Sequence, residues 1–180
     1  MFQQRRELLK AAAAAGAVAS LGSLGLAGCA TSSVPATTRV LVVGGGFGGA
    51  TAAKYVRWLS DYRIEVVLVE PGDAFVSCPI SNLVLGGSKT MSDITVPYAG
   101  LAKTHGVTVV KDMVASIDSA KKVALLASGP SIRYDKLVLS PGIELVWGSV
   151  AGLQEANATG RILQAWKAGP ETVALRKQLE

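Results

Sequence analysis

The chain has 180 residues, two cysteines, one histidine and a formal net charge of +5. Its length suffices for one domain with a buried core. The basic residues are scattered rather than interleaved with aromatic residues, which argues against nucleic-acid binding. A single histidine and the absence of a cysteine cluster argue against a metal site. The high apolar fraction, 49%, comes largely from the first thirty residues and does not indicate a membrane domain.

Residues 1–29 have the pattern of an export signal. Arg5 and Arg6 precede an apolar run from Ala11 to Leu26 that is rich in alanine and glycine. A charged start, an apolar middle and a small-residue exit are typical of a signal peptide, and paired arginines resemble a twin-arginine leader. A retained transmembrane helix is the alternative, and the abundance of Ala, Gly and Ser argues against it. The sequence therefore predicts export to the periplasm.

The end of this leader allows two kinds of processing. Leu26-Ala27-Gly28-Cys29 resembles a bacterial lipobox, in which Cys29 would carry a lipid, whereas ordinary cleavage after Ala30 competes with it. Both alternatives stay open. Residues 30–38 are small and polar and are predicted to form a linker. Contact with a membrane is expected only through the possible lipid anchor.

A glycine-rich turn follows the linker. A β-branched run, residues 40–43, leads into G-x-G-x-x-G at Gly44, Gly46 and Gly49, and a helical pattern covers Phe47–Leu59. In a dinucleotide-binding unit the first glycine permits the turn, the second lets the backbone approach a pyrophosphate, and the third lets helix and strand pack closely. The pyrophosphate lies at the helix N-terminus, where free N–H groups and the positive dipole end face it.

An acidic residue supports this interpretation. The second predicted strand, Ile64–Glu70, ends in a carboxylate 24 residues beyond Gly46, near the offset of about 20 at which an acid binds ribose hydroxyls. Glu70 fits NAD or FAD better than NADP, because it would repel a 2′-phosphate. A dinucleotide site is therefore preferred to a plain glycine-rich β–α turn.

The remaining pattern predicts an α/β fold of the two-dinucleotide-binding flavoprotein type, with a parallel sheet and a β-meander in place of one crossover. After a long connection, Ala74 to Lys89, the expected elements are a helix at 97–105, a strand at 107–110, hairpin arms at 114–117 and 123–127, and a buried strand within 134–142. From about Thr159 the pattern is helical, broken at Gly169-Pro170, and 171–180 resembles a helix without a stop signal. The expected domains are a Rossmann-like dinucleotide-binding domain at 39–150 and a following helical segment at 151–180, incomplete at its C-terminus.

Cys78 lies alone in the long connection. In an exported protein a leftover cysteine pairs with another molecule, reacts or is modified. In a two-dinucleotide flavoprotein, the loop after the acid-ended strand runs along the cofactor toward the isoalloxazine, and a thiol there could bond to the ring. On position alone, a small buried thiol is the preferred interpretation.

Four segments resemble the flavoprotein subunit of flavocytochrome c sulfide dehydrogenase. They are Gly44–Lys54, Phe75–Asn82, Leu139–Leu145 and Ala165–Gly169, within a similarity that extends from the leader to Glu180. The resemblance implies an exported FAD-dependent oxidoreductase that passes electrons from sulfide, or another sulfur compound, to a c-type cytochrome subunit. It also implies that the loop cysteine, Cys78, forms a thioether to the 8α-methyl group of FAD.

The same resemblance implies the other cofactor-binding residues. They comprise Gly44, Gly45, Gly46, Phe47, Gly48 and Gly49 at the pyrophosphate, Glu70 at the adenosine ribose with Pro71 beside it, Val114 offering backbone to the adenine, and Gly142 near the cofactor at a strand end. No catalytic residue is expected, since the family's redox-active cysteine pair lies further along than this chain extends. Three alternatives remain: a sulfide:quinone oxidoreductase-like flavoprotein, a non-catalytic FAD-binding fragment, and a pyridine-nucleotide dehydrogenase.

Overall fold

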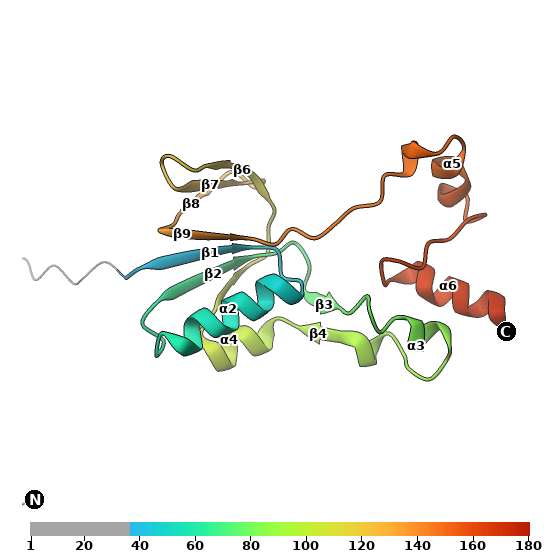
Figure 1. Cartoon of the computed structure of the whole chain (residues 1–180), viewed down its shortest axis with the longest axis horizontal. Coiled ribbons are helices and arrows are strands. Elements are labelled where there is room, and N and C mark those ends of the chain that lie inside the picture. The colour runs from blue at the N-terminus through green and yellow to red at the C-terminus, as the bar shows by residue number, and fades with distance from the viewer. Residues whose placement is uncertain (1–36) are drawn as a thin grey trace, which may run out of the picture. The chain divides into compact units, whose positions relative to one another are not determined.

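The computed structural model describes residues 37–180, and the predicted leader and most of the linker lie outside this range. Strands and α-helices, with two 3₁₀ helices named η1 and η2, follow one another along the described chain (Figure 1). In order they are β1 (Arg39–Val43), α2 (Phe47–Leu59), β2 (Glu65–Val69), β3 (Ala74–Val76), α3 (Asn82–Leu85), η1 (Ser92–Ile94), β4 (Thr95–Pro97), α4 (Ala99–His105), β5 (Thr108–Val110), β6 (Val114–Asp118), β7 (Val123–Leu126), β8 (Ser131–Arg133), β9 (Lys136–Leu139), η2 (Trp147–Ser149), α5 (Leu153–Ala158) and α6 (Pro170–Leu179).

A parallel sheet of four strands, in the order β5-β2-β1-β9, forms the centre of the fold. In the register, Leu41 lies opposite Val67 on one side and Leu137 on the other. β1 and β2 consist almost entirely of valine and leucine, because side chains of a central parallel strand are covered on both faces. The order places β2 and β9 on opposite sides of β1, which makes the β1–β9 boundary the topological switch point.

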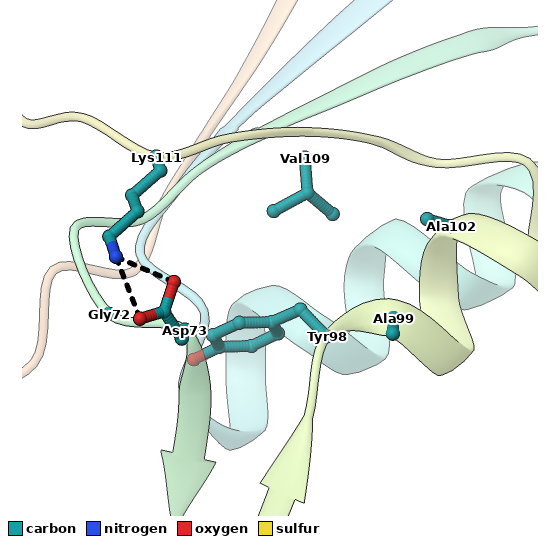
Figure 2. A pocket seen from close by; sticks show the side chains of 7 residues that line it. All are labelled: Gly72, Asp73, Tyr98, Ala99, Ala102, Val109 and Lys111. Atoms are coloured by element: carbon teal, nitrogen blue, oxygen red, sulfur yellow. Dashed lines mark hydrogen bonds and ion pairs between the residues drawn. The ribbon is translucent and has the colours of Figure 1, made fainter.

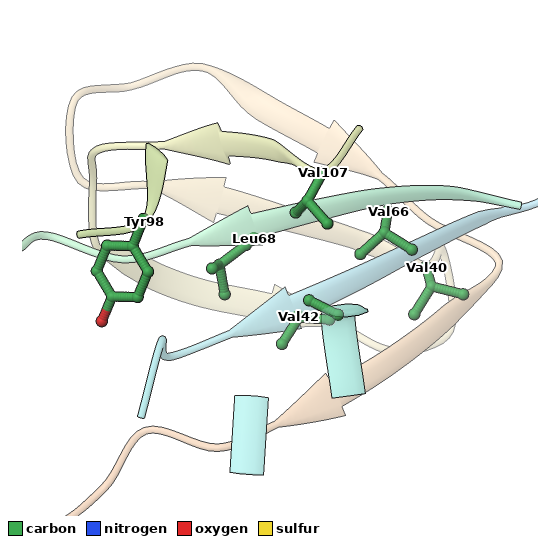
Figure 3. Packing of buried hydrophobic residues seen from close by; sticks show 7 residues of the cluster. Val40, Val42, Val66, Leu68, Tyr98 and Val107 are labelled. Atoms are coloured by element: carbon green, nitrogen blue, oxygen red, sulfur yellow. The ribbon is translucent and has the colours of Figure 1, made fainter. Parts of the chain in front are cut away.

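Successive side chains of β1 and β2 alternate between the two faces of the sheet, as the pleat requires. Val40, Val42, Val66 and Leu68 point to one face, where Tyr98 and Val107 join them (Figure 3). Val56 of α2 and Leu101 of α4 pack against this group, so both helices cover this face.

The opposite face is covered by a meander of three antiparallel strands, β6-β7-β8. Leu41, Val67 and Val69 pack there against Ala124, Leu126 and Tyr134. The expected hairpin arms are confirmed as β6 and β7, whereas the third strand, β8, was not predicted. The α/β, Rossmann-like fold with a parallel sheet and a meander is confirmed.

The C-terminal segment differs from its prediction. Helix α5 ends at Ala158, so the helix expected from about Thr159 is wrong, while the last helix is confirmed as α6. Glu171 explains the difference, because its carboxylate accepts hydrogen bonds from Gln164 N–H, 2.6 Å, and Asn157 Nδ2, 3.1 Å, and these hold the intervening residues outside a helix. The proposed domain boundary at residue 150 stays a prediction. No helix within residues 37–180 is long and apolar enough to span a bilayer.

Truncating Leu41 is expected to destabilise the fold strongly. Its side chain is fully buried at the centre of β1, and Leu→Ala changes at such sites lower the free energy of unfolding by about 2–5 kcal/mol. Equilibrium urea unfolding measures the effect. Leu59→Ala is the matched control, because Leu59 is 75% exposed at the end of α2 and its truncation is expected to change stability by less than about 0.5 kcal/mol. Equal effects of the two substitutions would contradict this description of the core.

Candidate cofactor-binding site

The carboxyl ends of β1, β2 and β9 meet at one edge of the sheet. β1 continues into the glycine bend (residues 44–49), β2 ends at Glu70, and β9 continues into Ser140. Ser140 N–H donates to Val43 O at 2.8 Å, and Gly44 N–H donates to Val69 O at 2.9 Å. Ligands of doubly wound sheets bind at this edge, beside the switch point.

Two glycines of the bend are required by the protein's own packing. Gly44 has φ +93°, and a Cβ there would collide with the backbone carbonyl of Ser140. A Cβ on Gly49 would collide with the carbonyl oxygen of Gly44. These contacts give the first glycine its role in the turn and the third its role in close packing between helix and strand.

Gly46 is different, because no described residue other than its chain neighbours has an atom within 4 Å of the position its Cβ would take. It is the N-cap of α2, its lack of a side chain leaves the first-turn N–H groups uncapped, and that turn contains no acidic residue. Such N–H groups have no intrahelical acceptor and lie at the positive end of the helix dipole. The space, the free donors and the sign of the field all fit a pyrophosphate at this position.

Glu70 lies directly beside the bend. Its Oε2 accepts from Gly45 N–H at 2.7 Å, and its Oε1 accepts from Gly72 N–H at 3.0 Å. A carboxylate offers about four lone-pair positions, so both oxygens keep acceptor capacity for ribose hydroxyls. The preference for NAD or FAD over NADP, expected from the charge of Glu70, stays a prediction.

Tyr98, which was not predicted from the sequence, contacts the glycine bend through its side chain. Its side chain is 5% exposed, and its hydroxyl donates to Gly45 O at 2.9 Å. Burial, with a smaller contribution from the charge of Glu70, raises the pKa of Tyr98 to about 12. The phenol therefore stays protonated and remains a donor at neutral pH. Ser140 was also missed, and its Oγ is the nearest atom to the Cβ position of Gly48.

Cys78 follows β3, which pairs with β4 in a two-stranded ribbon. The ribbon begins at the bend, since the rings of Phe47 and Phe75 meet edge to face with centroids 4.6 Å apart. Cys78 is three residues further along, on the order of 10 Å at about 3.3 Å per residue. The thiol is half-buried and unpaired within the described residues, and it lies outside both hydrophobic clusters of the sheet.

The other predicted residues fall into two groups. Pro71 adjoins Glu70, and Gly142, with φ +79° and nothing near its Cβ position, lies two residues after Ser140, so both belong to the carboxyl edge. Val114 begins β6 opposite Leu126 and packs with the meander cluster. Their roles as cofactor ligands stay predictions.

A hollow of about 170 Å³ lies beside Tyr98 (Figure 2). Tyr98, Ala99, Ala102 and Val109 form its apolar part, and the ion pair between Lys111 Nζ and Asp73, 2.7 Å, closes one side. Its volume is below the roughly 300 Å³ at which ligand pockets begin. This hollow therefore does not replace the bend as the candidate site.

The comparisons with known proteins agree with this geometry. The sequence pattern of the pyridine nucleotide-disulphide oxidoreductase family matches residues 38–169. The chain belongs to this family. The match includes the glycine bend, Glu70, Cys78 and the meander. Membership in this family of flavoproteins supports FAD as the dinucleotide.

Individual relatives show which proteins within this family the chain resembles. The chain is 67% identical, over 48 residues, to the flavoprotein chain of flavocytochrome c sulfide dehydrogenase from Chlorobaculum thiosulfatiphilum, a match that covers 27% of this chain and 98% of that sequence. It is 34% identical over 118 residues to the mitochondrial sulfide:quinone oxidoreductase of Dictyostelium discoideum, covering 66% of this chain and 26% of that protein. The resemblance to sulfide-oxidising flavoproteins is thereby confirmed.

A solved structure shows the same fold. The sulfide:quinone oxidoreductase of Aquifex aeolicus superposes with a TM-score of 0.67 and 28% identity, covering 79% of this chain and 31% of that one. The chain thus spans about a quarter to a third of the length of the sulfide:quinone oxidoreductases it matches.

Proposed function

We propose that the chain binds one FAD along the carboxyl edge of the sheet. The free N–H groups of the bend would hold the pyrophosphate, Glu70 would hold the adenosine ribose, and β3 and Cys78 would lie along the ring system. The observation that carries this proposal is Gly46, whose Cβ position faces open space while Gly44 and Gly49 are enclosed. The protein's own packing gives no reason for a glycine there, whereas a bound phosphate does.

The proposed activity is that of an FAD-dependent sulfide dehydrogenase. Support comes from 67% identity to a sulfide dehydrogenase flavoprotein chain and from the sulfide:quinone oxidoreductases among the relatives. Bound FAD supplies a two-electron acceptor, so that HS⁻ becomes zero-valent sulfur with loss of one proton, and two c-type haems then take one electron each. The chain's part is to hold the cofactor by its phosphates and ribose.

Cys78 is proposed to attach the cofactor covalently. Its half-buried thiol lies beyond the Phe47–Phe75 contact, on the segment along which the ring would extend. Forming the thioether breaks the S–H bond and one C–H bond of the 8α-methyl group. Two protons would leave, and the two electrons would have to be taken up by the haem acceptor named above. The neighbouring backbone is fixed, because Cys78 O accepts from Ser81 Oγ at 2.7 Å and from Ser81 N–H at 3.1 Å.

Anaerobic spectroscopy of the yellow protein tests the activity. In a version extended at its C-terminus to include the redox-active cysteine pair that the resemblance implies, sulfide is expected to bleach the flavin absorbance, and ferricytochrome c is expected to restore it faster than a soluble quinone does. Faster recovery with the quinone would favour the sulfide:quinone oxidoreductase alternative. A bound flavin that sulfide does not bleach would favour a cofactor-binding unit without catalysis. Bleaching by NADH instead of sulfide would identify a pyridine-nucleotide dehydrogenase.

Export to the periplasm is proposed from residues 1–29, which lie outside the described residues. Arg5→Lys combined with Arg6→Lys is expected to keep the protein in the cytoplasm, as cell fractionation would show. A lipid on Cys29 is expected to be lost in Cys29→Ser, measured by incorporation of labelled palmitate. Export of the doubly substituted chain would contradict the twin-arginine assignment.

A further inference from the structure

Tyr98 is placed where it can control the direction of one peptide group in the glycine bend. It lies 53 residues from Gly45 in sequence, at the N-cap of α4, yet its hydroxyl donates to Gly45 O at 2.9 Å. A Cβ on Gly45 would collide with the Tyr98 ring. Gly45 is therefore a glycine because of this contact, although it is not one of the three motif glycines.

The peptide that joins Gly45 to Gly46 is trans, since the described residues contain no cis bond. In a trans peptide the C=O and the following N–H point in opposite directions. Because Tyr98 donates to Gly45 O, Gly46 N–H points away from the Tyr98 hydroxyl. The Cβ position of the same residue, Gly46, meets no atom other than those of its chain neighbours within 4 Å. Glu70 fixes the preceding peptide through Gly45 N–H. Both peptides that flank Gly45 are thus held by side chains from outside the bend.

We propose that Tyr98 is a positioning residue for the dinucleotide phosphates, which acts by holding Gly46 N–H toward the bound pyrophosphate. This inference rests on the proposed binding of FAD. Phenylalanine would fill the same space without the donor, so that the buried Gly45 carbonyl would lose its partner and the peptide would be free to rotate. Preorganised donors bind an anion more tightly than donors that must first be ordered.

The test compares two buried tyrosines in a chain that carries Cys78→Ser, so that FAD binding is reversible. Tyr98→Phe removes the hydroxyl that holds the bend. Tyr134→Phe is the matched control, because Tyr134 is also buried, lies in the cluster on the other face of the sheet, and has no hydrogen bond from its hydroxyl within residues 37–180. Quenching of flavin fluorescence gives the dissociation constant for FAD, and ³¹P NMR reports on the bound phosphates.

Tyr98→Phe is expected to raise the dissociation constant about 3- to 10-fold and to shift the pyrophosphate resonances, while Tyr134→Phe changes neither. Circular dichroism of the cofactor-free variants confirms that both are folded. Folded variants with equal affinities and unchanged resonances would overturn the role of Tyr98 and leave FAD binding intact. A parent chain that is folded but does not bind FAD would overturn the proposed function and this inference together.

Discussion

Replacing Cys78 by serine is expected to convert a flavin that stays with the denatured chain into one that is released completely. Acid precipitation of the wild-type protein should leave the yellow colour and, after digestion, flavin fluorescence in the pellet. The Cys78→Ser protein should leave both in the supernatant. The reason is chemical, because a serine hydroxyl cannot form the thioether, whereas the non-covalent contacts at the glycine bend and at Glu70 are lost on unfolding.

The other cysteine of the chain, Cys29, provides the control for the Cys78→Ser substitution. Cys29→Ser should retain the flavin after precipitation as the wild type does. Before denaturation, Cys78→Ser should still contain FAD, because the bend and the acid are unchanged. Complete release of flavin from the wild-type chain would refute the covalent assignment and leave dinucleotide binding standing.

Replacing Gly46 by alanine is expected to weaken FAD binding without loss of stability, whereas replacing Gly49 by alanine is expected to lower the stability of the chain. Gly46→Ala places a methyl group in open space, so the free energy of unfolding of the cofactor-free chain should not change appreciably. Its dissociation constant for FAD, measured in the Cys78→Ser chain, should rise on the order of 10- to 100-fold, because the methyl group would occupy the place proposed for the phosphate. Gly49→Ala drives its Cβ into the carbonyl of Gly44, and the cofactor-free chain should lose about 3 kcal/mol of stability.

Gly100→Ala serves as the reference for both substitutions. Gly100 lies in α4 with no atom within 4 Å of its Cβ position, so alanine there should stabilise the helix by about 0.5–1 kcal/mol and leave FAD affinity unchanged. Urea unfolding and flavin titration separate the three variants. A Gly46→Ala chain that binds FAD as tightly as its parent would contradict the placement of the phosphates.

Short-range patterns predicted the core of this fold. The bounds of α2, Phe47–Leu59, agree with the sequence prediction, since a glycine-rich start and a 3.6-residue pattern mark both ends. The strands β3, β4 and β8 have three residues each and were not predicted. The helix expected after Thr159 failed because contacts from Glu171, distant in sequence, determine the conformation there.

In the candidate site, too, the residues that are close in sequence were predicted and the distant ones were not. The glycine bend and Glu70 belong to one β–α–β unit, so their spacing alone predicted that they lie together, and Gly45 N–H does donate to Glu70. Tyr98 directly precedes α4 and Ser140 directly follows β9, and only the packed sheet brings them to the bend. No local pattern marks a tyrosine whose hydroxyl donates to a glycine 53 residues away.

The most direct test of the account is peptide mapping of the purified yellow protein by mass spectrometry. Trypsin cleaves after Arg63 and Lys89, so one peptide, residues 64–89, contains both Glu70 and Cys78. We expect this peptide to carry the mass of one FAD less two hydrogens on Cys78, because in the proposed binding mode a cofactor bound at the glycine bend would reach that thiol. An unmodified 64–89 peptide from protein that still contains stoichiometric flavin would contradict the account.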